Sequence, residues 1–536
     1  MITRRKVLEG GMLTALASAL PFAWVRRAFA APPTTFDYYI SADGDDNNPG
    51  TLSQPWSITA LNSKMSLYGG KTIGIIGNTS ANPTVINTGK VGGVVTTLYS
   101  LYQSWVSGKA GSVLLLNGGT IPGAPTYIAT CDSTGAYSPR TAIIDAADPS
   151  TGNQPTVSVP FIGQVEYMAT AQVASYGNVT VDGLVVRNFT FSGLQFTGSE
   201  TAQSENVVIQ NCELYNGQNV QAQNNPGAIH FNGLIGAVIT NCCVHDLRTN
   251  APGSSNQMEA AGVIQFNSQG TTVTNCTFYN CFALSCKDSW QSMDVSYCYC
   301  GWGAFGSPYS REPQYSNWGA TIQNYISPTG TTVMFHHNIV LGPIFSKGAT
   351  IDANEGTVKI YNNTFYKSGG LGWMDLGLAC FSDYSDSNQA GGGGNFEFYN
   401  NLVFAEDGKY QNGGSAPAAF IKMGASAGGT WSTLSNCDYN VYGSGMTFGQ
   451  SWNTGDYGWS LSKWQGYGYD HHSTTLVASP FAGRPSEPDY TTFAIAGPAT
   501  TAGIGGGVCG AVDGSGRVGC DFSGAPAPVA SKLTVS

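Results

Sequence analysis

Six strand-like segments carry polar side chains at one common position. They read GLQFTG (193–198), AIHFNG (228–233), VIQFNS (263–268), LSCKDS (284–289), TIQNYI (321–326) and TIDANE (350–355). Successive side chains of a strand point to opposite faces, so one column is predicted to point inward: Leu194, Ile229, Ile264, Cys286, Ile322 and Ile351. The residue that follows each of these is then predicted to point outward: Gln195, His230, Gln265, Lys287, Gln323 and Asp352.

This outward column predicts a groove for an extended polymer. Six strands at a spacing of about 4.8 Å span about 24 Å, which is longer than a small metabolite. Gln195, Gln265 and Gln323 are predicted to bind the substrate by hydrogen bonds. Aromatic rings offer flat apolar faces with polar edges, which suits sugar rings. Long loops beside Lys287 supply such rings, and we predict that they contact the substrate: Trp290, Trp302, Tyr309, Tyr315 and Trp318.

The residue types favour a β-elimination reaction on a uronate. That reaction requires a base for the C5 proton and a cation beside the carboxylate. Lys287 is the predicted base, because burial and neighbouring cations lower the pKa of a lysine. Arg248 or Arg311 is predicted to neutralise the carboxylate, and His230 to bind or assist. The sequence therefore favours a polysaccharide lyase.

Two other functions stay open at this point. A glycoside hydrolase would need two carboxyl groups about 5–9.5 Å apart across one bond, and Asp288 with Asp352 is the best pair in the column segments. A non-catalytic surface or adhesion protein would use the fold only as a scaffold.

The elements that must position these residues form a repeat. One phrase recurs as VVIQNCELYNG (207–217), VITNCCVHD (238–246) and TVTNCTFYN (272–280), and in looser variants up to residue 440. The phrase returns irregularly, at spacings of 22 to 40 residues, and the segments between show no helical apolar stripe. This pattern predicts a solenoid of short parallel strands. Alignment of the phrases predicts one internal column: Cys212, Cys242, Cys276, Cys298, Asn338, Asn363, Asn401 and Cys437. Stacked Asn side chains bond along the axis, and reduced thiols fill an apolar slot.

Three parts of the sequence resemble a known superfamily. They are the opening phrase FDYYISADGDDNNPGTLSQPW (36–56), the Asn-rich coils, and the closing stretch from YDHHSTTLVASPFAG to GRVGCDF (469–522). In these segments the chain resembles the right-handed parallel β-helix (pectate-lyase-like) superfamily of secreted carbohydrate-active proteins. The resemblance implies an all-β fold and a polysaccharide substrate. It does not reach one catalytic family, because the galacturonan-hydrolase signatures are missing.

The ends of the chain predict export and capping. Residues 1–30 combine Arg4-Arg5, an apolar run and Ala28-Phe29-Ala30, which predicts a twin-arginine-type signal peptide and a periplasmic or secreted protein. We expect an N-terminal cap and first coils in 31–177, the β-helix core in 178–440, and C-terminal coils and a tail in 441–536. Within 31–177, Val94, Leu98, Leu101 and Trp105 share one helical face, so a helical cap or insertion is predicted there.

The charge and the cysteines restrict the partners and cofactors. The formal net charge of −10 argues against nucleic acid and anionic membranes, and we expect a monomer. No cofactor is required by the predicted chemistry, although calcium is left open, and no metal site is predicted. The thirteen cysteines show no pair of CxxC motifs. Cys509 and Cys520 lie outside the column and are candidates to pair. His336-His337 and His471-His472 are interpreted as packing residues.

Overall fold

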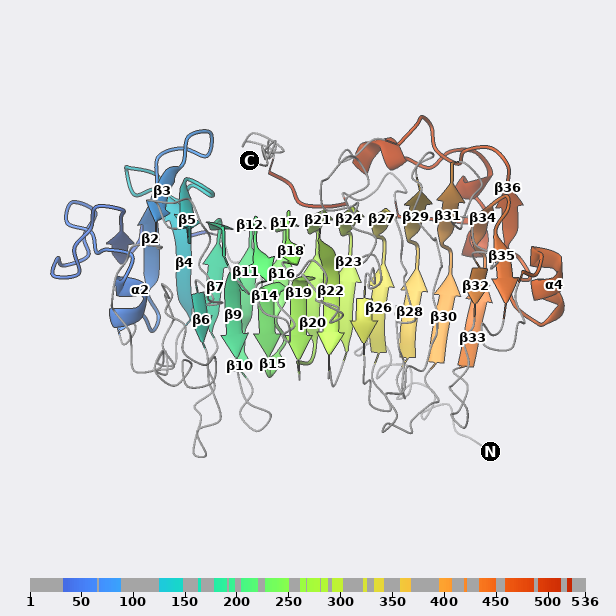
Figure 1. The fold of residues 1–536 in the computed structure, drawn as a ribbon, viewed down its shortest axis with the longest axis horizontal. Coiled ribbons are helices and arrows are strands. Elements are labelled where there is room, and N and C mark those ends of the chain that lie inside the picture. Colours follow the sequence, from blue (N-terminus) through green and yellow to red (C-terminus); the bar gives the residue numbers. More distant parts are fainter. Residues whose placement is uncertain are drawn as a thin grey trace, which may run out of the picture.

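The computed structural model describes 32–64, 67–87, 125–147, 162–164, 178–189, 192–197, 204–219, 227–249, 261–266, 268–279, 281–287, 292–301, 322–324, 332–341, 357–367, 395–406, 419–421, 433–449, 458–485, 490–511 and 518–522. Within these residues the chain is a stack of parallel strands in three long sheets (Figure 1). The predicted parallel β-helix is therefore confirmed. The predicted signal peptide and the predicted helical face at 94–105 lie outside the described residues.

Sheet 1 has twelve strands and runs the length of the molecule. In spatial order its strands are β1 (Tyr38–Ile40), β2 (Thr72–Ile76), β4 (Thr126–Cys131), β7 (Val179–Asp182), β11 (Val207–Gln210), β16 (Val238–Thr240), β20 (Thr271–Thr274), β23 (Met293–Ser296), β26 (Thr332–His336), β28 (Thr357–Tyr361), β30 (Asn395–Tyr399) and β33 (Thr433–Asp438).

Sheet 2 also has twelve strands and lies one corner further along each coil. Its strands are β3 (Thr84–Asn87), β5 (Ala142–Asp145), β8 (Val185–Arg187), β12 (Glu213–Tyr215), β17 (Cys243–His245), β21 (Thr277–Tyr279), β24 (Tyr299–Gly301), β27 (Ile339–Leu341), β29 (Thr364–Lys367), β31 (Leu402–Ala405), β34 (Val441–Gly443) and β36 (Thr474–Leu476).

Sheet 3 contains the segments whose polar residues form the predicted groove. Its strands are β6 (Ile162–Gln164), β9 (Leu194–Thr197), β14 (Gly227–Asn232), β19 (Ala261–Phe266), β22 (Phe282–Lys287) and β25 (Ile322–Asn324). From β9 to β25 each coil contributes one strand to sheet 3, then one to sheet 1 and one to sheet 2.

Short elements complete the described coils. Three two-stranded pairs are β10 (Ser204–Glu205) with β15 (Leu234–Ile235), β13 (Gln218–Asn219) with β18 (Arg248–Thr249), and β32 (Ala419–Ile421) with β35 (Thr447–Gly449). The helical turns are α2 (Ala60–Ser63), α4 (Leu461–Gly466), η3 (Tyr490–Phe493), η4 (Gly497–Thr500) and η5 (Ile504–Gly506). Figure 1 places α2 and α4 near opposite ends of the stack.

A two-residue corner between sheets 1 and 2 explains the recurring Asn-Cys pair. The first corner residue has φ between 51° and 66° in nine successive coils: Gly183, Asn211, Asn241, Asn275, Tyr297, His337, Asn362, Asn400 and Tyr439. Glycine and asparagine tolerate this left-handed conformation best. The second corner residue points into the core, where the internal column runs. Each pair therefore combines a turn residue with a column residue.

The internal column is confirmed over seven of its eight predicted members. Cys212, Cys242, Cys276 and Cys298 are fully buried and form no disulfide. Asn338, Asn363 and Asn401 continue the column through side-chain bonds: the backbone N of each residue from Cys298 onward donates to the next Oδ1 at 2.8–3.0 Å.

The prediction for Cys437 is wrong, because the eighth member is Asn440. The Oδ1 of Asn440 accepts from the backbone N of Asn401 at 2.9 Å. Cys437 instead pairs with Phe398 in sheet 1, two residues before the corner that begins at Tyr439. The phrase Asn436-Cys437 imitates the earlier Asn-Cys pairs, but the corner is formed by Tyr439-Asn440.

Candidate functional site

The outer face of sheet 3 is the predicted site, and its register differs from the prediction by one residue. Gln195 lies opposite His230, as predicted. His230, however, lies opposite Ile264 rather than Gln265. Ile264 in turn lies opposite Ser285, and Ser285 opposite Gln323. The observed column is therefore Gln195, His230, Ile264, Ser285 and Gln323, while Lys287 lies opposite Phe266.

The shift arises from the consecutive residues Val263 and Ile264. Val263 pairs with Ile229 and belongs to the buried core, together with Leu284 of the next strand. Ile264 is then on the outer side of the strand, which contradicts its predicted inward position. Two adjacent apolar residues satisfy alternation in either register, and a slip of one residue exchanges the two faces.

Gln265 consequently points into the coil instead of outward. It lies opposite Phe231, and its side chain is 1% exposed. Its Nε2 donates to the sulfur of Met293 at 3.6 Å, and Met293 belongs to the core. The predicted outward orientation of Gln265 is therefore wrong, and this side chain does not line an outer groove.

His230 is a buried, neutral imidazole on the outer side of sheet 3. The side chains before and after it, Ile229 and Phe231, are core residues, so alternation places His230 on the opposite face. It is only 8% exposed. Burial lowers the pKa of His230 to about 4, because removal from water disfavours the charged form. At neutral pH it therefore offers a hydrogen-bonding ring without a positive charge.

The backbone positions of three more predicted residues are described. Lys287 is the last residue of β22, and Gln323 is the middle residue of β25. Arg248 begins β18, where it lies opposite Gln218 outside sheet 3. The remaining predicted residues lie outside the described residues: Asp352, Arg311, Trp290, Trp302, Tyr309, Tyr315 and Trp318.

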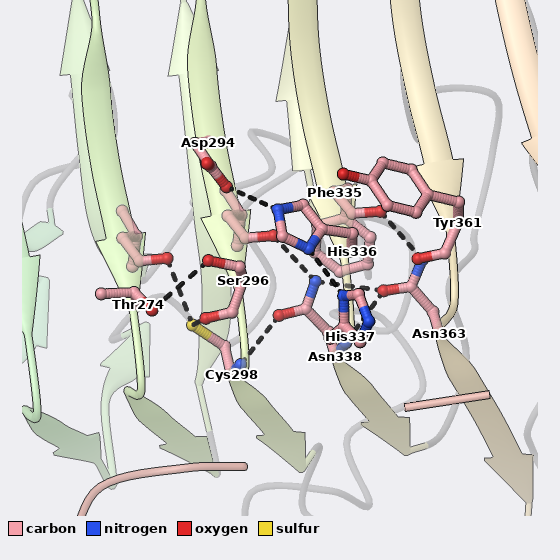
Figure 2. Close-up of polar contacts among 12 residues, drawn as sticks. Thr274, Asp294, Ser296, Cys298, Phe335, His336, His337, Asn338, Tyr361 and Asn363 are labelled. Atoms are coloured by element: carbon pink, nitrogen blue, oxygen red, sulfur yellow. Dashed lines mark hydrogen bonds and ion pairs between the residues drawn. The ribbon is translucent and has the colours of Figure 1, made fainter. Parts of the chain in front are cut away.

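The adjacent histidines 336 and 337 close a corner of sheet 1 (Figure 2). Their Nδ1 atoms are 2.8 Å apart, and the Nε2 of His336 lies 3.1 Å from an oxygen of Asp294. His337 has φ 56° and stacks on Tyr297 with ring centres 4.9 Å apart. His336 stacks on Tyr361 in the same way. This geometry confirms the interpretation of His337 as a packed residue in the corner column.

His472 has a comparable structural role at the end of the molecule. Its Nδ1 and its backbone N both lie 2.6 Å from the carboxylate of Asp438. Its ring stacks on Tyr439, another corner residue. Burial alone would raise the pKa of Asp438, but the hydrogen bonds from His472 outweigh it, and the pKa is lowered.

Among the described residues, the two fully buried carboxylates, Asp182 and Asp470, escaped the sequence analysis. Asp182 accepts from Tyr127, from Tyr137 at 3.0 Å, from Gln210 at 2.9 Å and from Asn211 at 2.7 Å. Burial, with a further contribution from the charge of Asp182, raises the pKa of both tyrosines. Four donors around one carboxylate identify Asp182 as an anchor of the first coils rather than an acid catalyst.

Asp470 anchors the last coils in the same way. It accepts from Trp464 Nε1 at 2.7 Å, Tyr442 OH at 3.0 Å, Asn440 Nδ2 at 2.9 Å and Ser473 Oγ. The Sγ of Cys437 also lies 3.1 Å from it. The sequence signal for this site is the group of tyrosines and tryptophans around 440–470. The polar edges of these rings need hydrogen-bond partners when they are buried.

His245 lies on sheet 2, away from the sheet 3 column. Its ring is stacked between Tyr215 and Tyr279, at centre distances of 5.0 and 4.5 Å. Its nitrogens contact Asp246 at 2.8 Å and Glu213 at 3.2 Å. Burial alone would lower the pKa of His245, but these two carboxylates outweigh it and raise the pKa. His245 therefore lies on sheet 2, whereas Lys287 ends a strand of sheet 3.

Among the described residues, no group of three His, Cys, Asp or Glu side chains is arranged to hold a metal ion. Helices long and apolar enough to cross a bilayer are likewise not found in the described part of the chain. That no cofactor is required, with calcium left open, stays a prediction.

The fold defines the chain as a parallel β-helix protein. Comparison with solved structures finds pectate lyase Pel9A (15% identity, TM-score 0.48, covering 89% of this chain and 92% of that one) and a rhamnogalacturonan lyase (11% identity, TM-score 0.48, covering 88% and 99%). A lacto-N-biosidase from Eubacterium ramulus matches over 62% of this chain and 64% of its own (12% identity, TM-score 0.30). No protein-family model and no curated protein sequence matches. At these identities and TM-scores, similarity to the solved structures does not show what activity this chain has.

Proposed function

We propose that this protein is a carbohydrate-active β-helix enzyme that cleaves a uronate-containing polysaccharide by β-elimination on the outer side of sheet 3. The observation that carries the proposal is the register column through Gln195, His230, Ser285 and Gln323, with Lys287 at the end of β22. Alternation puts position 287 on the same face as position 285. The proposed base therefore lies on the same face as hydrogen-bonding positions on β9, β14, β22 and β25, while β19 between them contributes Ile264.

The chemical roles follow from charge. In its unprotonated form, the Lys287 amine takes the C5 proton, the C4–O bond breaks, and the leaving oxygen is protonated. Because His230 is neutral, it serves as a hydrogen-bonding partner and not as the cation beside the carboxylate. Arg248 or Arg311 remains the proposed cation. The proposed location is extracytoplasmic, after export by the twin-arginine pathway.

The test is an activity assay on a panel of acidic and neutral polysaccharides. β-Elimination produces an unsaturated, ultraviolet-absorbing sugar together with a new reducing end. Lys287→Ala is expected to lower turnover at least about a hundredfold, since a general base contributes about 10²–10⁴. Lys359→Ala is the matched control, because Lys359 is paired with Glu397 at 3.0 Å on sheet 1.

Each outcome of this assay decides between functions. An increase in the concentration of reducing ends without an increase in ultraviolet absorbance would indicate hydrolysis. Asp288 and Asp352 are the candidate carboxyl groups for that reaction. No product from any polymer would favour a non-catalytic binding protein. Full activity of Lys287→Ala would remove Lys287 as the base.

A further inference from the structure

The C-terminal segment runs back along the outer face of sheet 2 (Figure 1). We call its described residues, 477–485, 490–511 and 518–522, the C-terminal strap. Apolar strap side chains form one buried cluster with outward residues of sheet 2: Phe481, Phe493, Ala499, Cys509, Ala511 and Val518 pack with Tyr299, Ile339, Leu341, Tyr366, Leu402, Phe404 and Val441. The strap is therefore an integral layer of the fold over these coils.

The last described residues of the strap are fixed by hydrogen bonds to earlier coils. The backbone N of Gly519 donates to the carbonyl of Tyr297 at 2.8 Å. The backbone N of Cys520 donates to Thr277 Oγ1 at 2.9 Å. Asp521 exchanges two bonds with the side chain of Asn241, one of them from Asn241 Nδ2 at 3.1 Å. Residue 520 is thus held between Thr277 and Asn241.

These bonds place Cys520 over Cys243. Cys243 is the first residue of β17 and lies directly opposite Thr277 of β21. It is also only two residues from Asn241. The two thiols are hydrogen-bond partners of each other. Cys243 is buried, whereas Cys520 is partly exposed. We infer that Cys243 and Cys520 form an oxidisable dithiol, which a small-molecule disulfide such as oxidised glutathione converts into an intrachain disulfide that fastens the strap to sheet 2.

The surroundings favour Cys520 as the attacking thiol. The hydrogen bonds from Cys243 and Thr277, together with the charge of Arg140, lower the pKa of Cys520 against the opposing effects of burial and Glu213. The same hydrogen bond to Cys520, together with burial, raises the pKa of Cys243 well above its ordinary value. The guanidinium of Arg140 is held nearby, 3.6 Å from the ring centre of Phe522. A thiolate is the nucleophile in disulfide exchange.

The reaction balances in two steps. The Cys520 thiolate attacks one sulfur of oxidised glutathione, the glutathione S–S bond breaks, and one glutathione leaves as a thiolate that takes up a proton. Cys243 then gives up its proton and attacks the Cys520 sulfur of the mixed disulfide, and the second glutathione leaves. Two protein thiols lose two electrons, and one glutathione disulfide becomes two glutathione thiols.

The other described thiols are buried, so they lack the partly exposed partner that Cys520 supplies. Cys509, which was a sequence-based candidate partner of Cys520, donates to the carbonyl of Tyr439 at 3.0 Å, and burial raises its pKa to about 12. Cys520 lies over the Thr277 strand, and five sheet 2 steps separate that strand from β34, which follows Tyr439. The four column cysteines donate to backbone carbonyls in the core. Oxidation is therefore expected to be selective for Cys243 and Cys520.

The experiment treats the reduced full-length protein with oxidised glutathione and analyses non-reduced peptides by mass spectrometry. We expect the intact mass to fall by two hydrogens and one new linked pair of peptides to contain Cys243 and Cys520. After proteolysis of the strap, the peptide with Cys520 should remain attached until a reductant is added. This measurement uses the unmodified chain, so its result does not depend on whether any variant folds.

Two variants test the order of attack. Cys243→Ser should accumulate glutathione on Cys520, whereas Cys520→Ser should accumulate little on buried Cys243. Cys509→Ser is the matched control and should cross-link like the unmodified chain. The proposal is overturned if both thiols remain titratable after treatment, or if the linked peptides join Cys243 to another cysteine such as Cys281.

Discussion

At the scale of single residues, the internal column shows that a thiol and an amide can perform the same task. The thiols of Cys212, Cys242, Cys276 and Cys298 each lie 3.6–3.8 Å from a carbonyl of the preceding coil. Asn338, Asn363, Asn401 and Asn440 direct Nδ2 to the equivalent carbonyl at 2.9–3.0 Å. In every case this carbonyl belongs to the residue three positions before the preceding column residue. Each asparagine Oδ1 also accepts a backbone N–H bond along the axis at 2.8–3.0 Å, whereas the thiols form only weaker thiol–thiol bonds in that direction.

This difference predicts unequal costs of substitution. Asn363→Ala removes the acceptor of the Asn338 backbone N at 3.0 Å and the donor to the Phe335 carbonyl at 2.9 Å. Each buried group left unsatisfied costs about 1–3 kcal/mol, so we expect a loss of about 3 kcal/mol or more. Cys276→Ala removes only a weak thiol donor and a small volume, and should cost about 1 kcal/mol. Urea denaturation of both variants measures the difference, and equal costs would contradict this account of the column.

His230 predicts a pH dependence of stability. Its pKa is about 4 in the folded protein against an ordinary value of 6.5. Between these values the unfolded chain binds a proton that the folded chain does not, so the free energy of unfolding rises with pH through this window. At about 1.4 kcal/mol per pKa unit, the loss on acidification is about 3 kcal/mol.

The measurement compares the chain with His230→Gln from pH 4 to 7. The variant should lose stability less steeply on acidification, because Gln does not titrate. His471→Gln is the control, since His471 is exposed, and it should reproduce the unmodified profile. A His230→Gln profile that parallels the unmodified one would show that His230 titrates normally.

At the scale of elements, the sequence was sufficient for the solenoid and for most of the internal column. Repetition made these visible, because equivalent residues stack one coil apart. Two positions failed for physical reasons. The dipeptide Asn436-Cys437 repeats the earlier Asn-Cys pairs, but it lies three residues before Tyr439-Asn440, which forms the corner. At Val263-Ile264 two apolar neighbours fit either face, so only packing of the whole coil fixes the register.

The observed register predicts the behaviour of Gln265. Because its side chain is inside the coil against Met293, Gln265→Ala should destabilise the fold by about 1–3 kcal/mol through the space left behind. Substrate binding per folded molecule should be unchanged. Gln195→Ala is the matched comparison, because Gln195 lies in the outer column opposite His230, and it should weaken binding instead. Weaker binding by a Gln265→Ala protein of normal stability would restore the register predicted from the sequence.

At the scale of the whole molecule, the solenoid and the strap stabilise each other. The outward residues of sheet 2 are apolar beneath the strap, as in Ile339, Leu402 and Val441. The sequence could not show this contact, because its partners are far apart along the chain: Asn241 and Asp521 are separated by 280 residues. Local patterns reveal the coils, whereas a non-repeating segment that covers them leaves no periodic signal.

The strap therefore predicts that one of its own residues controls the stability of distant coils. Phe493 is fully buried and makes edge contacts with Tyr366 and Phe481, at ring-centre distances of 5.4 and 5.7 Å. Phe493→Ala should cost about 3–5 kcal/mol, as for other large-to-small changes in a core. Because Cys509 is buried in the same cluster, loosening of the strap should also make its thiol reactive before the solenoid unfolds. Thermal denaturation and native thiol titration measure both effects.

Ile504→Ala is the control: Ile504 belongs to the strap but is 50% exposed, so its change in the free energy of unfolding should be within about 0.5 kcal/mol. If Phe493→Ala leaves both the melting temperature and the reactivity of Cys509 unchanged, the strap contributes nothing to the fold beneath it.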